Sequence, residues 1–228
     1  MILAFLAAAV AAAQAPAPCP DVVTPQAFVC RALKASNSGD SATAAQAFEQ
    51  AAAAQNDEAE KARLWAAAGN MWIAANDPGK AAVALDKALT GSGLQAEQRG
   101  EALLDRARAA EAQNDLKTAR SKVTEAARTV SDDPFLWYFS AALAIRENDA
   151  VTAKAAIGKA LSLEPNNPTV LFEAGHVYHF AGELSAARDY WNRASAADAN
   201  GKSGQAAREA LKMLSAPAAV QSEPAPTK

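Results

Sequence analysis

Alanine residues recur every 34 positions through the second half of this chain, and such a regular recurrence restricts the possible folds sharply. Two series share this interval: Ala119, Ala153 and Ala187, and Ala126, Ala160 and Ala194. Two further alanines continue the first series toward the N-terminus, Ala81 after an interval of 38 residues and Ala44 after one of 37. A period in this range is typical of a solenoid built from repeated supersecondary units.

The recurrence divides the chain into units near 25–58, 62–95, 100–133, 134–167 and 168–201. We predict that the surplus residues around the second unit form two longer loops, at Gln55–Lys61 and Gly91–Arg99. After the last unit, residues 202–215 carry small and apolar side chains at helical spacing, which predicts a capping helix. Residues 216–228 are rich in Pro, Ala and Ser without periodicity, which predicts a disordered tail.

Each unit is expected to contain two helices that cross closely. Such a crossing requires small side chains where the two backbones approach each other. Three units begin with a capping side chain followed by proline, at Thr24, Asp133 and Asn167. Small residues stand where the helix backbones would approach, at positions 32, 69, 107, 141 and 175. Large residues that would fill the layer between units are Phe48, Leu85, Val123, Ile157 and Trp191. An unrelated alanine-rich bundle is the alternative, but helical patterning alone predicts no 34-residue register.

These units resemble the tetratricopeptide repeat family, whose pattern is W-x2-L-G-x2-Y, then A-x3-F, then a late Ala and Pro. The second unit matches with Trp65, Ala68, Gly69, Trp72, Ala81, Leu85 and Ala88. The fifth matches with Leu171, Ala174, Gly175, Tyr178, Ala187, Trp191 and Ala194. The resemblance implies an all-α fold, a right-handed α-solenoid of about five helix–turn–helix repeats followed by the capping helix.

The N-terminal residues 1–13 are predicted to be a secretory signal peptide, because they are apolar throughout and end in three alanines. This stretch is too short to span a membrane, which needs about 20 apolar residues. A proline-rich extension, residues 14–24, follows it. We therefore expect an exported protein of the bacterial periplasm, with a cytoplasmic or membrane-associated protein as the alternative.

Two cysteines, Cys19 and Cys30, flank the first predicted helix start. In an oxidising compartment, an even number of cysteines close in sequence predicts a disulfide bond. Such a bond would fasten the extension onto the first helix and protect the open end of the solenoid. Lipidation of Cys19 is the alternative, although the preceding Pro16–Pro18 stretch lacks the pattern of a lipoprotein signal.

The sequence offers little for catalysis or nucleic-acid binding. The formal net charge is −3 and no basic run is present, so we expect no nucleic-acid partner. The only histidines, His176 and His179, follow Glu173 at spacings of three, a conceivable metal site that lacks the usual pairing of ligands four residues apart. Nucleophile and phosphate-loop motifs are missing, so we expect neither an enzyme nor a cofactor.

In the resembled family, the first helix of each repeat lines a concave groove that accepts a peptide or helical segment of a partner. By this resemblance, the groove residues of highest interest are Tyr138, Phe135, Phe172, Ile145, His176, His179, Arg108 and Asn70. Other positions expected along it are Val29, Leu33, Arg63, Ala66, Ile73, Leu104, Glu111 and Ala142. Because clustered aromatic side chains commonly anchor interfaces, the C-terminal units are expected to carry the contact.

These observations predict a non-enzymatic scaffold that binds another protein, in the assembly or maintenance of the cell envelope. A self-associating structural protein is one alternative. A metal- or small-ligand-binding periplasmic protein that uses Glu173, His176 and His179 is another. The choice between them depends on the site rather than on the fold.

Overall fold

The computed structural model describes residues 18–215 and is all-α over that range. The helices are α1 (Pro25–Asn37), α2 (Ser41–Ala54), α3 (Glu58–Ala74), α4 (Pro78–Leu89), α5 (Ala96–Ala112), α6 (Leu116–Ala126), α7 (Pro134–Arg146), α8 (Ala150–Leu163), α9 (Pro168–Phe180), α10 (Leu184–Ala197) and α11 (Lys202–Ser215). The predicted signal peptide, residues 1–13, and the predicted tail, residues 216–228, lie outside the described residues.

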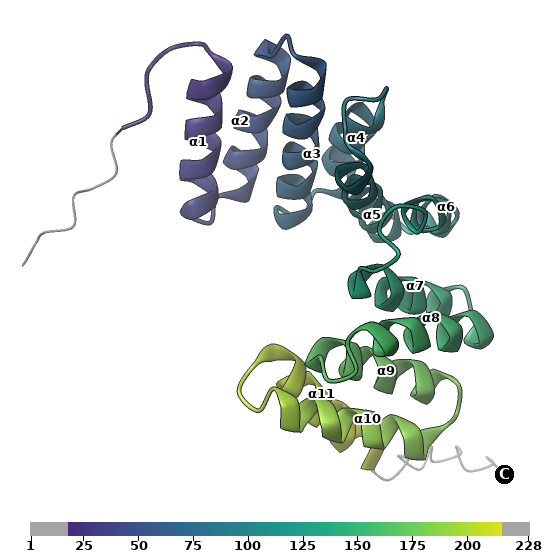
Figure 1. The fold of residues 1–228 in the computed structure, drawn as a ribbon. Coiled ribbons are helices and arrows are strands. Elements are labelled where there is room, and N and C mark those ends of the chain that lie inside the picture. The colour runs from purple at the N-terminus through teal and green to yellow at the C-terminus, as the bar shows by residue number, and fades with distance from the viewer. Residues whose placement is uncertain (1–17, 216–228) are drawn as a thin grey trace, which may run out of the picture.

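The helices pack in the order of the chain and form a TPR-like solenoid (Figure 1). Helices that are neighbours in sequence contact each other, and α3 also contacts α5 as α7 contacts α9. Together they trace an arc whose two ends, α1 and α11, lie on the same side (Figure 1). The predicted all-α solenoid is therefore confirmed. Within residues 18–215, no helix is both long and apolar enough to span a bilayer.

The packing between paired helices matches a small residue to a large one. Gly69 on α3 faces Leu85 on α4, and a Cβ atom at this glycine would lie 2.4 Å from the Leu85 Cγ atom. Gly175 on α9 faces Trp191 on α10 even more closely, with 2.2 Å between its hypothetical Cβ and the indole Nε1 atom. Side-chain volume on the second helix thus decides how small the first-helix residue must be.

The turn inside each helix pair has a common construction. A residue with positive φ comes first and an acidic residue follows it, as in Asn76–Asp77 and Asn114–Asp115. The aspartate accepts a hydrogen bond from the backbone N–H three residues later, at 3.0 Å for both Asp77 and Asp115. Hydrogen bonds of this kind hold the pKa of both carboxyl groups below the usual range. Local sequence therefore fixes where the second helix of the pair begins.

The predicted longer loops at Gln55–Lys61 and Gly91–Arg99 are wrong in extent, because α3 and α5 begin inside them. Each of these helices has 17 residues and takes up most of the surplus as an extra N-terminal turn. The Asp57 side chain accepts a hydrogen bond from the Glu60 backbone at 2.8 Å and so starts α3. Gln95 opens α5 with a capping box.

The two ends of the solenoid are finished differently. At the N-terminal end, Cys19 and Cys30 form a disulfide bond that joins the extension to α1. A second tie comes from Arg31, whose Nη2 atom donates a hydrogen bond to the Val22 carbonyl at 2.6 Å. The C-terminal end is covered by α11, which packs on α10 and α9. Its buried Ala207 and Ala210 join the cluster of buried residues that contains Leu171 and Trp191.

Candidate functional site

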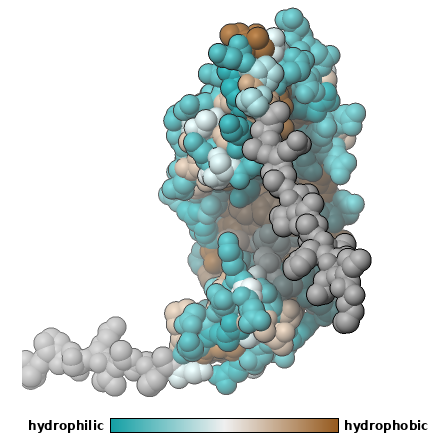
Figure 2. All heavy atoms as spheres, turned by 90° about the vertical axis from the view of Figure 1, so that its left-hand side faces the viewer, coloured by the Kyte–Doolittle hydropathy of each residue, from teal (hydrophilic) through white to brown (hydrophobic). Residues whose placement is uncertain are grey.

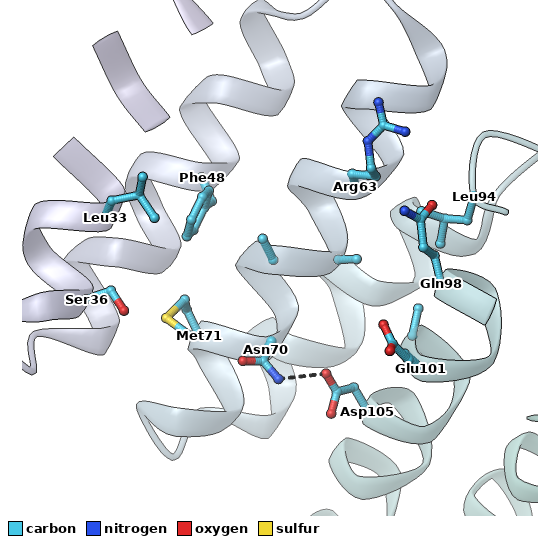
Figure 3. A pocket seen from close by; sticks show the side chains of 13 residues that line it. Leu33, Ser36, Phe48, Arg63, Asn70, Met71, Leu94, Gln98, Glu101 and Asp105 are labelled. Carbon is cyan, nitrogen blue, oxygen red and sulfur yellow. Dashed lines mark hydrogen bonds between the residues drawn. The ribbon is translucent and has the colours of Figure 1, made fainter. Parts of the chain in front are cut away.

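The open side of the arc is hollowed and lined in part by hydrophobic residues (Figure 2). In its N-terminal half a cavity of about 440 Å³ lies between α1, α2, α3 and α5, which we call the concave cavity (Figure 3). Its lining residues are Leu33, Ser36, Phe48, Arg63, Ala66, Ala67, Asn70, Met71, Leu94, Gln98, Glu101, Ala102 and Asp105. This volume falls within the range of sites that hold small ligands or side chains of a partner.

Apolar and polar side chains occupy different parts of the concave cavity. Leu33, Phe48 and Met71 come from three helices and face the same space (Figure 3). On the other side, Asn70 of α3 donates a hydrogen bond from Nδ2 to Asp105 of α5 at 2.8 Å (Figure 3). This bond joins neighbouring first helices at the cavity, so the polar wall is held in place before any ligand binds.

Three of the predicted groove residues meet farther along the arc, on α5 and α7. The Phe135 and Tyr138 rings lie 5.1 Å apart in an edge-to-face arrangement, and the Arg108 guanidinium lies 5.7 Å from the centre of the Phe135 ring. Phe135 also stacks on Phe139 at 5.7 Å. All three aromatic side chains are half-buried and pack against core clusters, so each remains partly accessible to solvent. Ile145, on the same helix, is also half-buried and packs against the neighbouring core cluster.

The remaining predicted residues gather around Trp191. Phe172 contacts His176 with 4.5 Å between ring centres, and His176 and His179 lie 5.4 and 5.6 Å from the Trp191 ring. Burial, with a further effect of the neighbouring His179, lowers the pKa of His176. Among residues 18–215, no group of three or more His, Cys, Asp or Glu side chains is arranged to hold a metal ion. Glu173, His176 and His179 are not among such groups.

The concave cavity contains residues that first-helix spacing does not indicate. Leu33, Arg63, Ala66 and Asn70 were expected along a groove, and they line it. Phe48 belongs to a second helix and Leu94 to the connection before α5, so a pattern of first-helix positions misses both. The repeat period could still have indicated both residues, because it places each of them in a segment that packs against a first helix.

The Glu173 carboxyl group is half-buried on α9, and burial raises its pKa to about 6 from the ordinary value of 4.5. A raised pKa means that the folded state favours the protonated form. The resulting stabilisation is complete below about pH 4.5 and is lost as the pH rises through about 6. Ionised Glu173 therefore lowers the stability of the fold at neutral pH.

Replacing Glu173 by Gln is expected to stabilise the protein at pH 7.5 and to leave its stability unchanged near pH 4. The pKa change corresponds to about 2 kcal/mol, and partial exposure to solvent reduces the expected gain to about 1 kcal/mol. Urea unfolding of both proteins at the two pH values measures this difference. An equal gain at both pH values would contradict an origin in the charge of the carboxylate.

Comparison with known proteins identifies the architecture. No protein-family model matches the chain, and no curated protein matches it. Among solved structures, YrrB, described as a TPR protein with an unusual peptide-binding site, is 15% identical, with a TM-score of 0.60 over 82% of this chain and 91% of its own. PilW, a type IV pilus biogenesis factor, is 17% identical, with a TM-score of 0.64 over 79% and 81%. PilF of Pseudomonas aeruginosa is 14% identical, with a TM-score of 0.66 over 83% of each chain.

Proposed function

We propose that this TPR-like solenoid is a non-enzymatic scaffold that binds a segment of another protein along its concave face. The observation that carries the proposal is the concave cavity, where an apolar part formed by three helices adjoins a fixed polar wall (Figure 3). An apolar surface with a few fixed polar groups suits the side chains and backbone of a peptide or helix.

The stacked helices would act by presenting a rigid surface. Because the cavity-lining side chains are held by neighbouring units, binding would cost mainly the ordering of the partner segment. The aromatic residues on α7 and α9 would extend the same face toward the C-terminus, with Tyr138, Phe135 and Phe172 as anchors and Ile145, Arg108, His176 and His179 around them.

A role in the cell envelope is part of this proposal. The predicted signal peptide would direct the chain to an oxidising compartment, and the Cys19–Cys30 disulfide bond suits that environment. PilW, one of the structural neighbours, is a type IV pilus biogenesis factor, and YrrB carries a peptide-binding site. The description of YrrB supports a partner that is a peptide segment.

Placing a charge in the concave cavity is expected to weaken partner binding at least tenfold. Short peptides would be selected from a random display library on the parent protein, and their affinity would be measured by fluorescence anisotropy. In Met71→Glu a carboxylate would replace an apolar contact that lines the cavity, which desolvation penalises. The tenfold loss corresponds to about 1.4 kcal/mol.

The matched control is Val83→Glu, because Val83 is 57% exposed on α4 and does not line the concave cavity. Circular dichroism checks that both variants keep the helical content of the parent. Peptides that bind both variants as they bind the parent would place the binding surface elsewhere. The Tyr138→Ala/Phe172→Ala double variant then asks whether the aromatic residues of α7 and α9 contribute.

Self-association is a second candidate, supported by exposed apolar side chains near the N-terminal end of the described residues. Val23 and Leu33 are 82% and 52% exposed there, and a second cavity of about 640 Å³ is lined by Val29, Leu33 and both disulfide cysteines, among others. Exposed apolar surface of this kind commonly marks an interface. Molar mass that rises with concentration in light scattering would favour this candidate, and a constant monomer mass would remove it.

A further inference from the structure

The repeat itself allows two carboxylates in the same structural position to be compared. Asp105 on α5 and Glu173 on α9 are separated by 68 residues, which is two 34-residue periods. The same interval separates Arg108 from His176, so both carboxylates have a side chain of equivalent register one turn later. Both helices are first helices of their pairs, and both contact the first helix of the preceding pair, α3 and α7 respectively.

At Asp105 the protein supplies a donor to each carboxylate oxygen. Asn70 on the preceding first helix donates to Oδ2 at 2.8 Å, and Arg108 on the same helix donates to Oδ1 at 2.9 Å. The Arg108 contact is also an ion pair. The charge of Asp105 is therefore compensated within the protein.

At Glu173 both of these donors are replaced. Asn70 and Arg108 occupy the same position in successive repeats, and in the next repeat this position is Ala142 on α7. Ala142 therefore stands where Asn70 would be, and it has no polar side-chain atom. His176 takes the register of Arg108, but its ring packs against Phe172 and Trp191. Burial raises the pKa of Glu173, and no hydrogen bond or neighbouring cation within residues 18–215 offsets that effect. A half-buried carboxylate without a donor loses part of its hydration without compensation from the protein.

Aromatic side chains lie beside this uncompensated charge. Tyr138 on α7 packs against the cluster that contains Val170, Ala174 and Val177 of α9, on either side of Glu173 in the chain. Burial, and after it the charge of Glu173, raise the pKa of the Tyr138 phenol. Phe135 lies 5.1 Å from Tyr138 by ring centres, and Phe172 precedes Glu173 in the chain. Other charged groups that act on Tyr138 are the acidic Asp133 and Glu164 and the basic Arg108, so acidic groups predominate. Aromatic faces next to a carboxylate favour a cationic ligand.

We propose that Glu173 binds the cationic side chain, lysine or arginine, of a basic partner segment on the concave face. The ligand's ammonium or guanidinium group would take the place that the Arg108 guanidinium and the Asn70 amide take at Asp105. The Tyr138 and Phe172 rings would contact its aliphatic stem or its charged plane. This inference rests on the proposed function and specifies the chemistry of the partner at one position.

The inference is tested with three short probes on the full chain: acetyl-Ala-Arg-Ala-amide, acetyl-Ala-Lys-Ala-amide and the neutral acetyl-Ala-Gln-Ala-amide. The side-chain carboxyl carbons of glutamate are labelled with ¹³C, and the Glu173 resonance is assigned from its loss in Glu173→Gln. The basic probes are expected to shift this resonance saturably at millimolar concentration, at least tenfold more tightly than the neutral probe. The same probes should bind at least tenfold more weakly near pH 4, where the carboxyl group is protonated.

Glu209→Gln serves as the control variant, because Glu209 lies on the exposed surface of α11 and pairs with Lys212 three residues away. It should bind the basic probes as the parent does, whereas Glu173→Gln should not. Equal binding of basic and neutral probes, or unchanged binding to Glu173→Gln, would overturn the inference.

Failure of the Glu173 site and failure of the proposed function would give different results. Selected peptides that depend on Met71, together with basic probes that leave the Glu173 resonance unmoved, would overturn this inference alone. Saturable binding of the basic probes with no peptide selected from the library would support the Glu173 site and count against segment binding in the concave cavity.

Discussion

Substituting alanine for Gly175 is expected to destabilise the protein by about 3 kcal/mol in urea unfolding at neutral pH. The added Cβ atom would lie 2.2 Å from Nε1 and 2.3 Å from Cδ1 of Trp191, well inside contact distance. The indole cannot easily withdraw, because it is only 3% exposed and its N–H donates to the Phe172 carbonyl at 3.2 Å. The α9–α10 crossing must therefore open, or the indole must give up its hydrogen bond.

Gly158→Ala is the matched control for this prediction. Gly158 also lies inside a helix, α8, but it is exposed and a Cβ atom there would meet nothing within 4 Å. Alanine at this position should stabilise the protein by up to about 1 kcal/mol, because it has the higher helix propensity. If both alanine variants change stability equally, the close contact with Trp191 is not what Gly175 provides.

A second change should recover part of the loss. Ala141 and Ile157 occupy the same register in the preceding helix pair and are both fully buried. The double variant Gly175→Ala/Trp191→Ile reproduces this pair in α9 and α10. It is expected to be more stable than Gly175→Ala alone, although the smaller isoleucine forfeits contacts that the indole makes with α11. Recovery of stability would show that the two positions are coupled through their volumes.

The fold could be predicted from the recurring positions of the repeat, because they indicate both where the helices lie and how neighbouring helices pack. The positions of small residues such as Gly69 and of large residues such as Leu85 follow from the packing of one helix on the next. Since each unit contacts mainly its neighbours, five similar units imply one continuous solenoid. The prediction therefore did not depend on contacts between units that are distant in the sequence.

Where the register was interrupted, sequence reasoning failed. Extra residues before α3 and α5 were assigned to loops, yet each became a turn of helix. The local signal for α3 was present, since Asp57 stands three residues before Glu60 at the start of a helical pattern. The loop before α5 also packs closely on α3, where a Cβ atom on Gly93 would lie 2.6 Å from the Glu58 carbonyl. Such a contact depends on the tertiary fold, which the repeat pattern does not describe.

The candidate site was predictable only in part. First-helix spacing placed Leu33 and Asn70 on the concave face, where both line the concave cavity. It also gave most weight to aromatic residues on α7 and α9, but these pack largely on one another and on the core. The exceptional position of Glu173 emerges only from its missing donors, which requires the hydrogen bonds of Asp105 for comparison.

A charge introduced at Ala207 is expected to detach α11 from the end of the solenoid. Ala207 is fully buried against the cluster that contains Leu171 and Trp191, so the Ala207→Glu variant would bury a carboxylate among apolar side chains. Such burial without a partner costs about 3 kcal/mol or more, and the helix avoids this cost by separating from α10. Separation would leave the apolar end of the last repeat open to water.

Met213→Glu introduces the same charge in the same helix at a side chain that is 72% exposed, so it should leave stability nearly unchanged. Hydrogen exchange locates the effect of Ala207→Glu. Because each unit contacts mainly its neighbours, protection should fall in α9, α10 and α11 and persist in α1 to α4. If protection falls equally along the whole chain, the solenoid unfolds as a single cooperative unit. The capping helix would then stabilise the distant concave cavity as well as the end it covers.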